Sequence, residues 1–106
     1  MLVAISISPS GPPRDGTAAA DGGVSDAVAA ALQVVRDSGL PHELNAMFTN
    51  IEGEWDEVMA VVKQAVDVVA AVSPRVGLVL KADIRPGFTG QLDAKVDRIE
   101  AALADG

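Results

Sequence analysis

The sequence predicts an α+β fold in which the strands of one antiparallel sheet are interspersed with helices along the chain. Two segments, 2–8 and 75–85, alternate apolar side chains with other residues at period two, which is typical of half-buried strands. Two further segments, 24–37 and 55–72, place apolar residues every three or four positions, which is typical of amphipathic helices. Of the 106 residues, 49% are hydrophobic. A chain of this length and composition predicts one domain with one core.

The first strand and the first helix are separated by a segment rich in Pro and Gly. Val3, Ile5 and Ile7 lie on one side of the strand over 2–8. Residues 10–23 contain few large apolar side chains, and we expect them to form a flexible loop. The helix that follows has an apolar stripe made of Val24, Val28, Leu32 and Val35. The run Ser38-Gly39-Leu40-Pro41 ends it, because Gly is preferred just after a helix and Pro cannot continue one.

The middle of the chain predicts a hairpin and then the longest helix. Residues 42–52 are extended in character and predict two short strands that turn near residues 47–49, although no Asn-Gly or Asp-Gly pair marks the turn. An acidic turn over 54–57 begins the helix, and Ser73-Pro74 closes it. Its apolar stripe is Trp55, Val58, Met59, Val62, Val66 and Val69. This spacing places Trp55 in the core.

The end of the chain predicts a fourth strand and a terminal helix. In the strand over 75–85, every second residue from Val76 to Ile84 faces inward. The residues between them, every second one from Gly77 to Arg85, face the other side of the sheet. The helix over 91–104 turns Leu92, Val96, Ile99 and Leu103 inward. The order strand, helix, strand, strand, helix, strand predicts a ferredoxin-like βαββαβ sandwich with an additional C-terminal helix. Residues 1–106 therefore make a single ferredoxin-like domain.

Composition excludes several classes of function. Eight basic and fifteen acidic residues give a net charge of −7, so neither nucleic acid nor an anionic membrane is expected as a partner. With no Cys and one His, thiolate metal sites, cysteine nucleophiles and His-dependent triads are not expected. No signal peptide or membrane-spanning segment is visible, which predicts a cytoplasmic protein. No nucleophile and base can be paired, so we expect neither catalysis nor a cofactor or metal.

Strand alternation also predicts a polar open face on the sheet. With the apolar side chains against the helices, the opposite face carries Ser6, Ser8, Asn45, Met47, Glu52, Lys81 and Asp83. Such a face is solvated, covered by another subunit or bound to a polar ligand. Four acidic residues lie around the start of the longest helix: Glu52, Glu54, Asp56 and Glu57. They either complement the dipole at the N-terminus of that helix or bind a divalent cation. The charged residues Lys81, Asp83 and Arg85 of one strand face either bind a zwitterionic ligand or neutralise one another.

A family resemblance narrows these alternatives. The run Leu44-Asn45-Ala46-Met47-Phe48-Thr49-Asn50-Ile51-Glu52-Gly53, followed by Trp55-Asp56-Glu57-Val58, resembles the signature of the thiamine-binding, YkoF-like family. Ile5-Ser6-Ile7-Ser8-Pro9 and Lys81-x-Asp83-x-Arg85 are similar to further elements of that family, in the same order. The loop over 10–23 is longer than the family usually shows, and Phe48 stands where a small residue is more familiar.

The resemblance implies ferredoxin-like modules that pair through their sheets as homodimers or homotetramers. It also implies a pocket for thiamine or a related pyrimidine near a subunit interface. The candidate ligand-binding residues that it implies are Ser6, Ser8, Asn45, Met47, Thr49, Glu52, Lys81, Asp83 and Arg85. Thiamine is a cation, for which Glu52 and Asp83 are the candidate carboxylates. We therefore expect a non-catalytic protein that binds a small metabolite; the alternative is an assembly or regulatory module whose polar sheet face is only a subunit interface.

Overall fold

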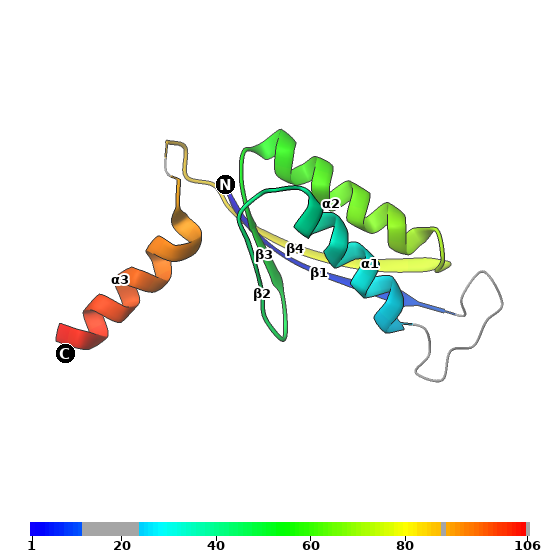
Figure 1. Ribbon diagram of the computed structural model, residues 1–106, viewed down its shortest axis with the longest axis horizontal. Coiled ribbons are helices and arrows are strands. Elements are labelled where there is room, and N and C mark those ends of the chain that lie inside the picture. The colour runs from blue at the N-terminus through cyan, green and yellow to red at the C-terminus, as the bar shows by residue number, and fades with distance from the viewer. Residues whose placement is uncertain (12–23, 88, 106) are drawn as a thin grey trace.

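A computed structural model describes residues 1–11, 24–87 and 89–105 of the chain. The loop predicted for 10–23 lies, from residue 12 on, outside the described residues. The elements follow the predicted order (Figure 1). They are β1 (Leu2–Ser10), α1 (Val24–Asp37), β2 (His42–Leu44), β3 (Thr49–Glu52), α2 (Trp55–Ala70), β4 (Arg75–Asp83) and α3 (Gln91–Asp105).

The four strands form one antiparallel sheet in the order β2-β3-β1-β4. In the centre, Val3 of β1 pairs with Ile51 of β3 on one side and with Ala82 of β4 on the other. Both α1 and α2 lie along the same face of the sheet (Figure 1). This is the ferredoxin-like arrangement, and the predicted α+β fold class is confirmed.

The core lies between the sheet and the two helices and is built from small aliphatic side chains. Val3, Ile5 and Ile51 point from the sheet toward Val58 and Val62 of α2, and all five are buried. A second cluster joins the two helices through Ala27, Ala31, Ala65 and Val69. Because three of these four are alanines, α1 and α2 can pack closely against each other.

The first residue of α2 departs from the prediction. Trp55 is 54% exposed, whereas the buried positions of this helix begin at Val58. The acidic first turn forms a capping box, in which the Glu57 side chain accepts a hydrogen bond from the Glu54 backbone N–H. The helix therefore begins as expected, but its first three residues are exposed and burial starts only at Val58. The placement of Trp55 in the core was wrong.

The terminal helix departs further. It begins beside β3 and then points away from the sheet and the other helices (Figure 1). Val96, Ile99 and Leu103, which were predicted to face inward, are 52%, 62% and 72% exposed. The spacing of these residues correctly predicted the helix, but this end of the chain meets no apolar surface among the described residues. None of the described helices combines the length and the hydropathy that crossing a membrane would require.

Candidate functional site

A cavity of about 210 Å³ opens between α1 and the β2–β3 hairpin, on the face of the sheet that the helices cover. We call it the hairpin cavity. Its apolar wall includes Ile5 of β1 with Val28 and Leu32 of α1. The polar residues of its lining are Ser6, Asn45 and Thr49. The Ser6 side chain alternates with the buried Ile5 and points to the open face, so Ser6 borders the cavity through its backbone. No charged side chain is part of its described lining.

Asn45 shapes the loop that closes one side of this cavity. Its side-chain Oδ1 accepts hydrogen bonds from the backbone N–H of Met47 at 2.9 Å and of Phe48 at 2.8 Å. Its own backbone N–H donates to the Phe48 carbonyl at 2.9 Å. An Asn side chain that captures nearby N–H groups makes a tight turn without a Gly. The turn therefore spans 45–48, rather than lying near 47–49 as predicted.

This loop corrects two placements on the open face of the sheet. Asn45 and Met47 were expected to be strand residues there, but both lie in the hairpin loop and border the hairpin cavity. Met47 is 75% exposed, so its side chain stands at the rim. Phe48, the departure from the family pattern, also lines the cavity. An aromatic ring here narrows the space in comparison with a small side chain.

Thr49 is the polar residue that is most enclosed by the hairpin cavity. It pairs with Ile5 of β1, so its side chain points to the helix-covered face, and it is 5% exposed. Among the described residues, every polar side-chain atom that is completely buried has a hydrogen-bond partner. The Thr49 hydroxyl has no such partner within the described part of the chain, so it is not completely buried. That hydroxyl is therefore not sealed off, and the cavity that Thr49 lines can reach it.

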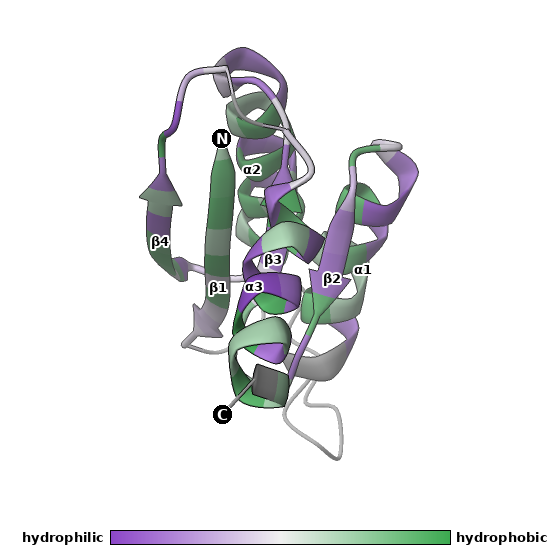
Figure 2. Cartoon of the chain, turned by 90° about the vertical axis from the view of Figure 1, so that its left-hand side faces the viewer, coloured by the Kyte–Doolittle hydropathy of each residue, from purple (hydrophilic) through white to green (hydrophobic). Residues whose placement is uncertain are grey.

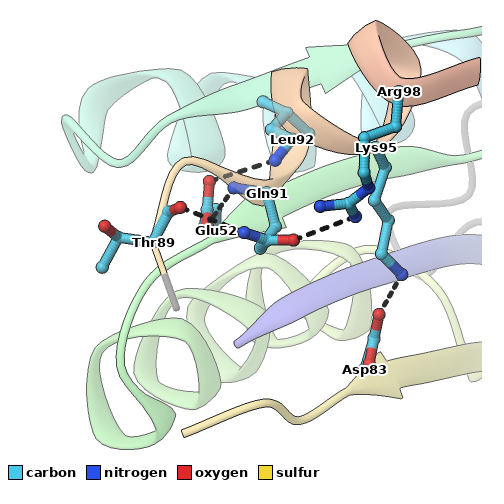
Figure 3. Close-up of polar contacts among 7 residues, drawn as sticks. All are labelled: Glu52, Asp83, Thr89, Gln91, Leu92, Lys95 and Arg98. Carbon is cyan, nitrogen blue, oxygen red and sulfur yellow. Dashed lines mark hydrogen bonds and ion pairs between the residues drawn. The ribbon is translucent and has the colours of Figure 1, made fainter. Parts of the chain in front are cut away.

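Glu52 has a structural partner that the sequence did not reveal. Its carboxylate is 7% exposed and accepts the backbone N–H of Gln91 at 2.8 Å and that of Leu92 at 3.3 Å (Figure 3). Glu52 thus caps the N-terminus of α3 from 39 residues away in the chain. Both carboxylate oxygens are engaged in this way.

A second cavity, of about 350 Å³, lies beside this cap. Glu52, Glu54, Glu57 and Asp93 line it together with apolar residues that include Met1 and Leu40. Each of the first three carboxylates serves a helix start: Glu52 that of α3, and the Glu54–Glu57 capping box that of α2. The arrangement favours the helix-terminus interpretation of the acidic cluster over a cation site.

The charged residues of β4 lie apart from the hairpin cavity. Lys81 and Asp83 pair with Ala4 and Leu2 on the open face, as strand alternation predicts. Asp83 also forms an ion pair with Lys95 of α3 (Figure 3). The hydrogen bond and the charge of Lys95 hold the pKa of the Asp83 carboxyl below its usual value. Asp83 therefore helps to anchor α3.

The structure thus divides the nine candidate residues among several places. Ser6, Asn45, Met47 and Thr49 border the hairpin cavity. Glu52 and Asp83 bind α3 instead. Lys81 and Ser8 lie exposed on the open face, and Arg85 follows the end of β4. The sequence did not point to Val28 and Leu32 as cavity residues, although the stripe of α1 contains both; it gave no signal for Lys95.

Chemically, the hairpin cavity offers apolar walls and a few hydrogen-bonding groups. Drug-sized ligands usually occupy pockets of about 300–1,000 Å³. At about 210 Å³, the hairpin cavity suits a single ring with its substituents. Its uncharged lining favours a neutral ring over an ion, because an unpaired charge is costly to bury there.

Comparison with known proteins shows similarity along nearly the whole chain. Residues 3–100 match the model of a family described as "Thiamine-binding protein". UPF0045 protein Mb1933 of Mycobacterium bovis is 49% identical over 104 residues, which cover 97% of this chain and 94% of that protein. UPF0045 protein sll0230 of Synechocystis is 38% identical over 81 residues, which cover 76% of this chain and 67% of that protein.

Solved structures share the fold. Hypothetical protein MJ1052 of Methanocaldococcus jannascii is 31% identical with a TM-score of 0.77, over 93% of this chain and 94% of that one. A domain of unknown function (DUF77) from Bacillus cereus is 31% identical with a TM-score of 0.74, over 90% of this chain and 85% of that one.

Proposed function

Because this chain belongs to the thiamine-binding protein family, we propose that it binds thiamine or a related pyrimidine without chemical turnover. The family assignment supports a small-molecule binding role. We further propose that the aminopyrimidine ring enters the hairpin cavity. A cytoplasmic location and assembly as a homodimer or homotetramer are also part of the proposal.

The hairpin cavity is the observation that carries this proposal. An aminopyrimidine is a flat neutral ring with hydrogen-bond donors and acceptors on its edge. Apolar residues such as Val28 and Leu32 can contact the faces of the ring, and the Thr49 hydroxyl can bond its edge. The volume of about 210 Å³ accommodates this one ring.

The charged half of thiamine would then remain outside the cavity. The thiazolium ring is a cation, and the lining of the hairpin cavity contains no carboxylate to balance it. At the mouth it stays hydrated, in the field of a chain with a net charge of −7. Glu52, the earlier candidate for the balancing carboxylate, is engaged at α3.

A calorimetric titration tests the proposal on the unmodified protein. The ligands are thiamine, its mono- and diphosphate, and the free aminopyrimidine. We expect thiamine and the free pyrimidine to bind within about tenfold of each other, which is about 1.4 kcal/mol, since both present the same ring to the cavity. The phosphates should bind no more tightly than thiamine, and each ligand should be recovered unchanged after incubation. Absence of binding by every compound, or conversion of any of them, contradicts the proposal.

The second candidate function is an assembly or regulatory module. The exposed apolar residues of α3 favour it, because such a surface is typical of an interaction site. The same titration separates the two candidates: a protein that associates but binds none of the four compounds is an assembly module.

A further inference from the structure

One edge of β1 loses its partner strand where it passes the hairpin cavity. β1 pairs with β4 from Leu2 to Ser10, along its whole length. On the other edge, β3 accompanies β1 only as far as Ile5, which pairs with Thr49. In Figure 1, β1 and β4 therefore run on side by side beyond the hairpin. We call the side of residues 6–10 that faces away from β4 the β1 edge; the described part of the chain places no strand along it.

The hydrogen bonds at the start of the strand indicate which residue faces the β1 edge. The Met1 ammonium donates to the Gly53 carbonyl at 2.9 Å, and the Gly53 N–H donates to the Met1 carbonyl at 3.1 Å. Such doubly bonded positions recur at every second residue of an antiparallel pair, so the register extends them to Ile5. Ile7 is the next in this series. Its N–H and carbonyl therefore point to the β1 edge, whereas those of Ser6 point to β4.

Among the described residues, no backbone group takes the place of β3 opposite Ile7. Continuing the register would set Met47 there, but Met47 lies in the hairpin loop and its N–H donates to the Asn45 side chain at 2.9 Å. The following residue on this edge is Pro9, which has no N–H. Pro fits a strand where its nitrogen faces no partner strand. Beyond Ile5, Ile7 is thus the residue of β1 that offers this edge both a donor and an acceptor.

The donor and the acceptor of Ile7 border the hairpin cavity. Ser6 and Ile7 both line it, and Ser6 does so through its backbone. The peptide bond between them is therefore part of the cavity wall, two residues along β1 from the Ile5–Thr49 pair. Figure 2 shows β1 next to β4, hydrophobic over most of its length and hydrophilic at its end. A backbone donor and acceptor in such surroundings are costly to leave without a partner.

We infer that Ile7 recognises the ring in the hairpin cavity through its backbone, in the place of a partner strand. The Ile7 N–H donates to a ring nitrogen, and the Ile7 carbonyl accepts a hydrogen bond from an amino group on the neighbouring ring carbon. An amidine carries this acceptor and this donor side by side, as a paired strand does. The ligand class is therefore a planar ring with an amidine edge, as in 4-aminopyrimidines. This inference rests on the proposed function and names the edge by which its ligand is bound.

An extended peptide fits the β1 edge less well than a small ring does. A peptide that adds a strand to a sheet needs several donors and acceptors in a row. Pro9 leaves β1 with one N–H on this edge beyond Ile5. The hairpin loop also closes the other side of the cavity, whose volume of about 210 Å³ accommodates one ring. The space and the backbone groups therefore both favour the ring.

Amide hydrogen exchange of the unmodified full chain, followed by NMR, tests the role of Ile7 without any substitution. In the free protein, the Ile7 amide should exchange faster than that of Ser8, which faces β4. Saturating 4-amino-2-methylpyrimidine should slow exchange at Ile7 by about tenfold, since the N–H is then bonded, and leave Ser8 unchanged. Unchanged exchange at Ile7 with the ring bound overturns the inference. So does an Ile7 amide that is as protected as Ser8 before any ligand is added.

A pair of ligands tests the amidine edge. The compound 2,4-dimethylpyrimidine keeps both ring nitrogens of 4-amino-2-methylpyrimidine but has a methyl group in place of the amine. In calorimetric titrations of the unmodified chain it should bind about tenfold more weakly, because the Ile7 carbonyl loses its donor. Equal affinities of the two compounds contradict the inference and leave the proposed function standing. If neither compound binds, the proposed function fails and the inference fails with it.

Two variants separate the N–H of Ile7 from its side chain. Ile7→Pro removes an N–H that points away from β4, so the β1–β4 pairing is kept. Ile7→Ala shortens the side chain but keeps the N–H, and is the matched control. Ile7→Pro should bind 4-amino-2-methylpyrimidine about tenfold more weakly than Ile7→Ala. Equal affinities in the two folded variants overturn the inference; if circular dichroism shows that Ile7→Pro does not fold, the exchange measurement on the unmodified chain decides.

Discussion

Two helices of nearly equal length, α2 and α3, carry similar apolar stripes but have opposite environments. Five residues of α2, among them Val58 and Val69, are buried against the sheet and α1. The stripe of α3 is exposed from Val96 to Leu103. Sequence periodicity predicts both helices equally well. It indicates which face of a helix is apolar, but it does not show whether that face is buried by the same chain.

The comparison separates residues that stabilise the single chain from residues available for association. Val58 and Ile51 belong to the first group, since both are fully buried. Ile99 and Leu103 belong to the second. Between the groups lies a small set of polar contacts, centred on Glu52, that orients α3. Substitutions in these three sets should have clearly different effects.

The largest effect is expected in the core. Ile51→Ala removes a fully buried side chain at the centre of the sheet, and we expect it to lower the free energy of unfolding by about 2–5 kcal/mol. Ile99→Ala makes the same chemical change on α3, and at concentrations where the protein is monomeric it should cost less than about 0.5 kcal/mol. Urea denaturation measures both. Equal costs would mean that the α3 stripe is buried within the chain.

The cap of α3 should give an intermediate effect. Glu52→Gln keeps the shape of the side chain but removes its charge from the helix N-terminus, and it should weaken the local stability of the first turn by about 1–2 kcal/mol. Hydrogen exchange at the amides of Gln91 and Leu92 reports this loss. Glu43→Gln, at an exposed position of β2, is the control. Unchanged exchange together with lost thiamine affinity would return Glu52 to the ligand site.

Trp55 should contribute less than the sequence suggests. A buried Trp typically costs about 3–5 kcal/mol when it is truncated to Ala. Because Trp55 is 54% exposed, we expect Trp55→Ala to lower the free energy of unfolding by less than about 1 kcal/mol. Denaturation of the variant, followed by circular dichroism, measures this. A loss of several kcal/mol would place Trp55 in a buried contact.

The smallest effect concerns the ion pair between α3 and β4. Lys95 lowers the pKa of Asp83 in the folded protein, so the pair is formed above that pKa and is lost as the pH falls through it. Lys95→Gln should raise the pKa of Asp83 toward its ordinary value of 3.8, as measured by an NMR titration of the carboxyl carbon. Lys63→Gln, which removes a cation paired with Asp67 on α2, should leave the pKa of Asp83 unchanged. An identical titration of Asp83 in Lys95→Gln would show that the pair does not form.

Most of the fold was predictable because local pattern and long-range packing agree. Val3 and Ile5 alternate with less buried neighbours in β1, and Gly39 takes a φ of 76° just past the end of α1. The hairpin turn was misplaced because Asn45 closes it through side-chain hydrogen bonds rather than through a Gly pair. Trp55 was misplaced because periodicity shows which face of a helix is apolar but not at which residue its burial begins.

The candidate site was predictable only in part. Four of the candidate residues border the hairpin cavity: Ser6, Asn45, Met47 and Thr49. Glu52 instead caps α3 from 39 residues away in the chain, and Asp83 pairs with Lys95 of the same helix. A carboxylate that caps a distant helix looks, in a sequence, like a carboxylate that binds a cation. Only the position of Gln91 and Lys95 in the fold distinguishes the two.

Comparing the ligand affinities of two single variants, Thr49→Val and Thr89→Val, tests most directly whether the ligand binds in the hairpin cavity. Both substitutions replace a hydroxyl with a methyl group, but Thr49 lines the hairpin cavity, whereas Thr89 is exposed in the segment just before α3. In calorimetric titrations with the free aminopyrimidine, Thr49→Val should bind about 5- to 10-fold more weakly than the unmodified chain, the loss of one hydrogen bond. Thr89→Val should bind as the unmodified chain does. Full affinity in Thr49→Val, with its circular dichroism spectrum unchanged, would contradict a ligand in the hairpin cavity.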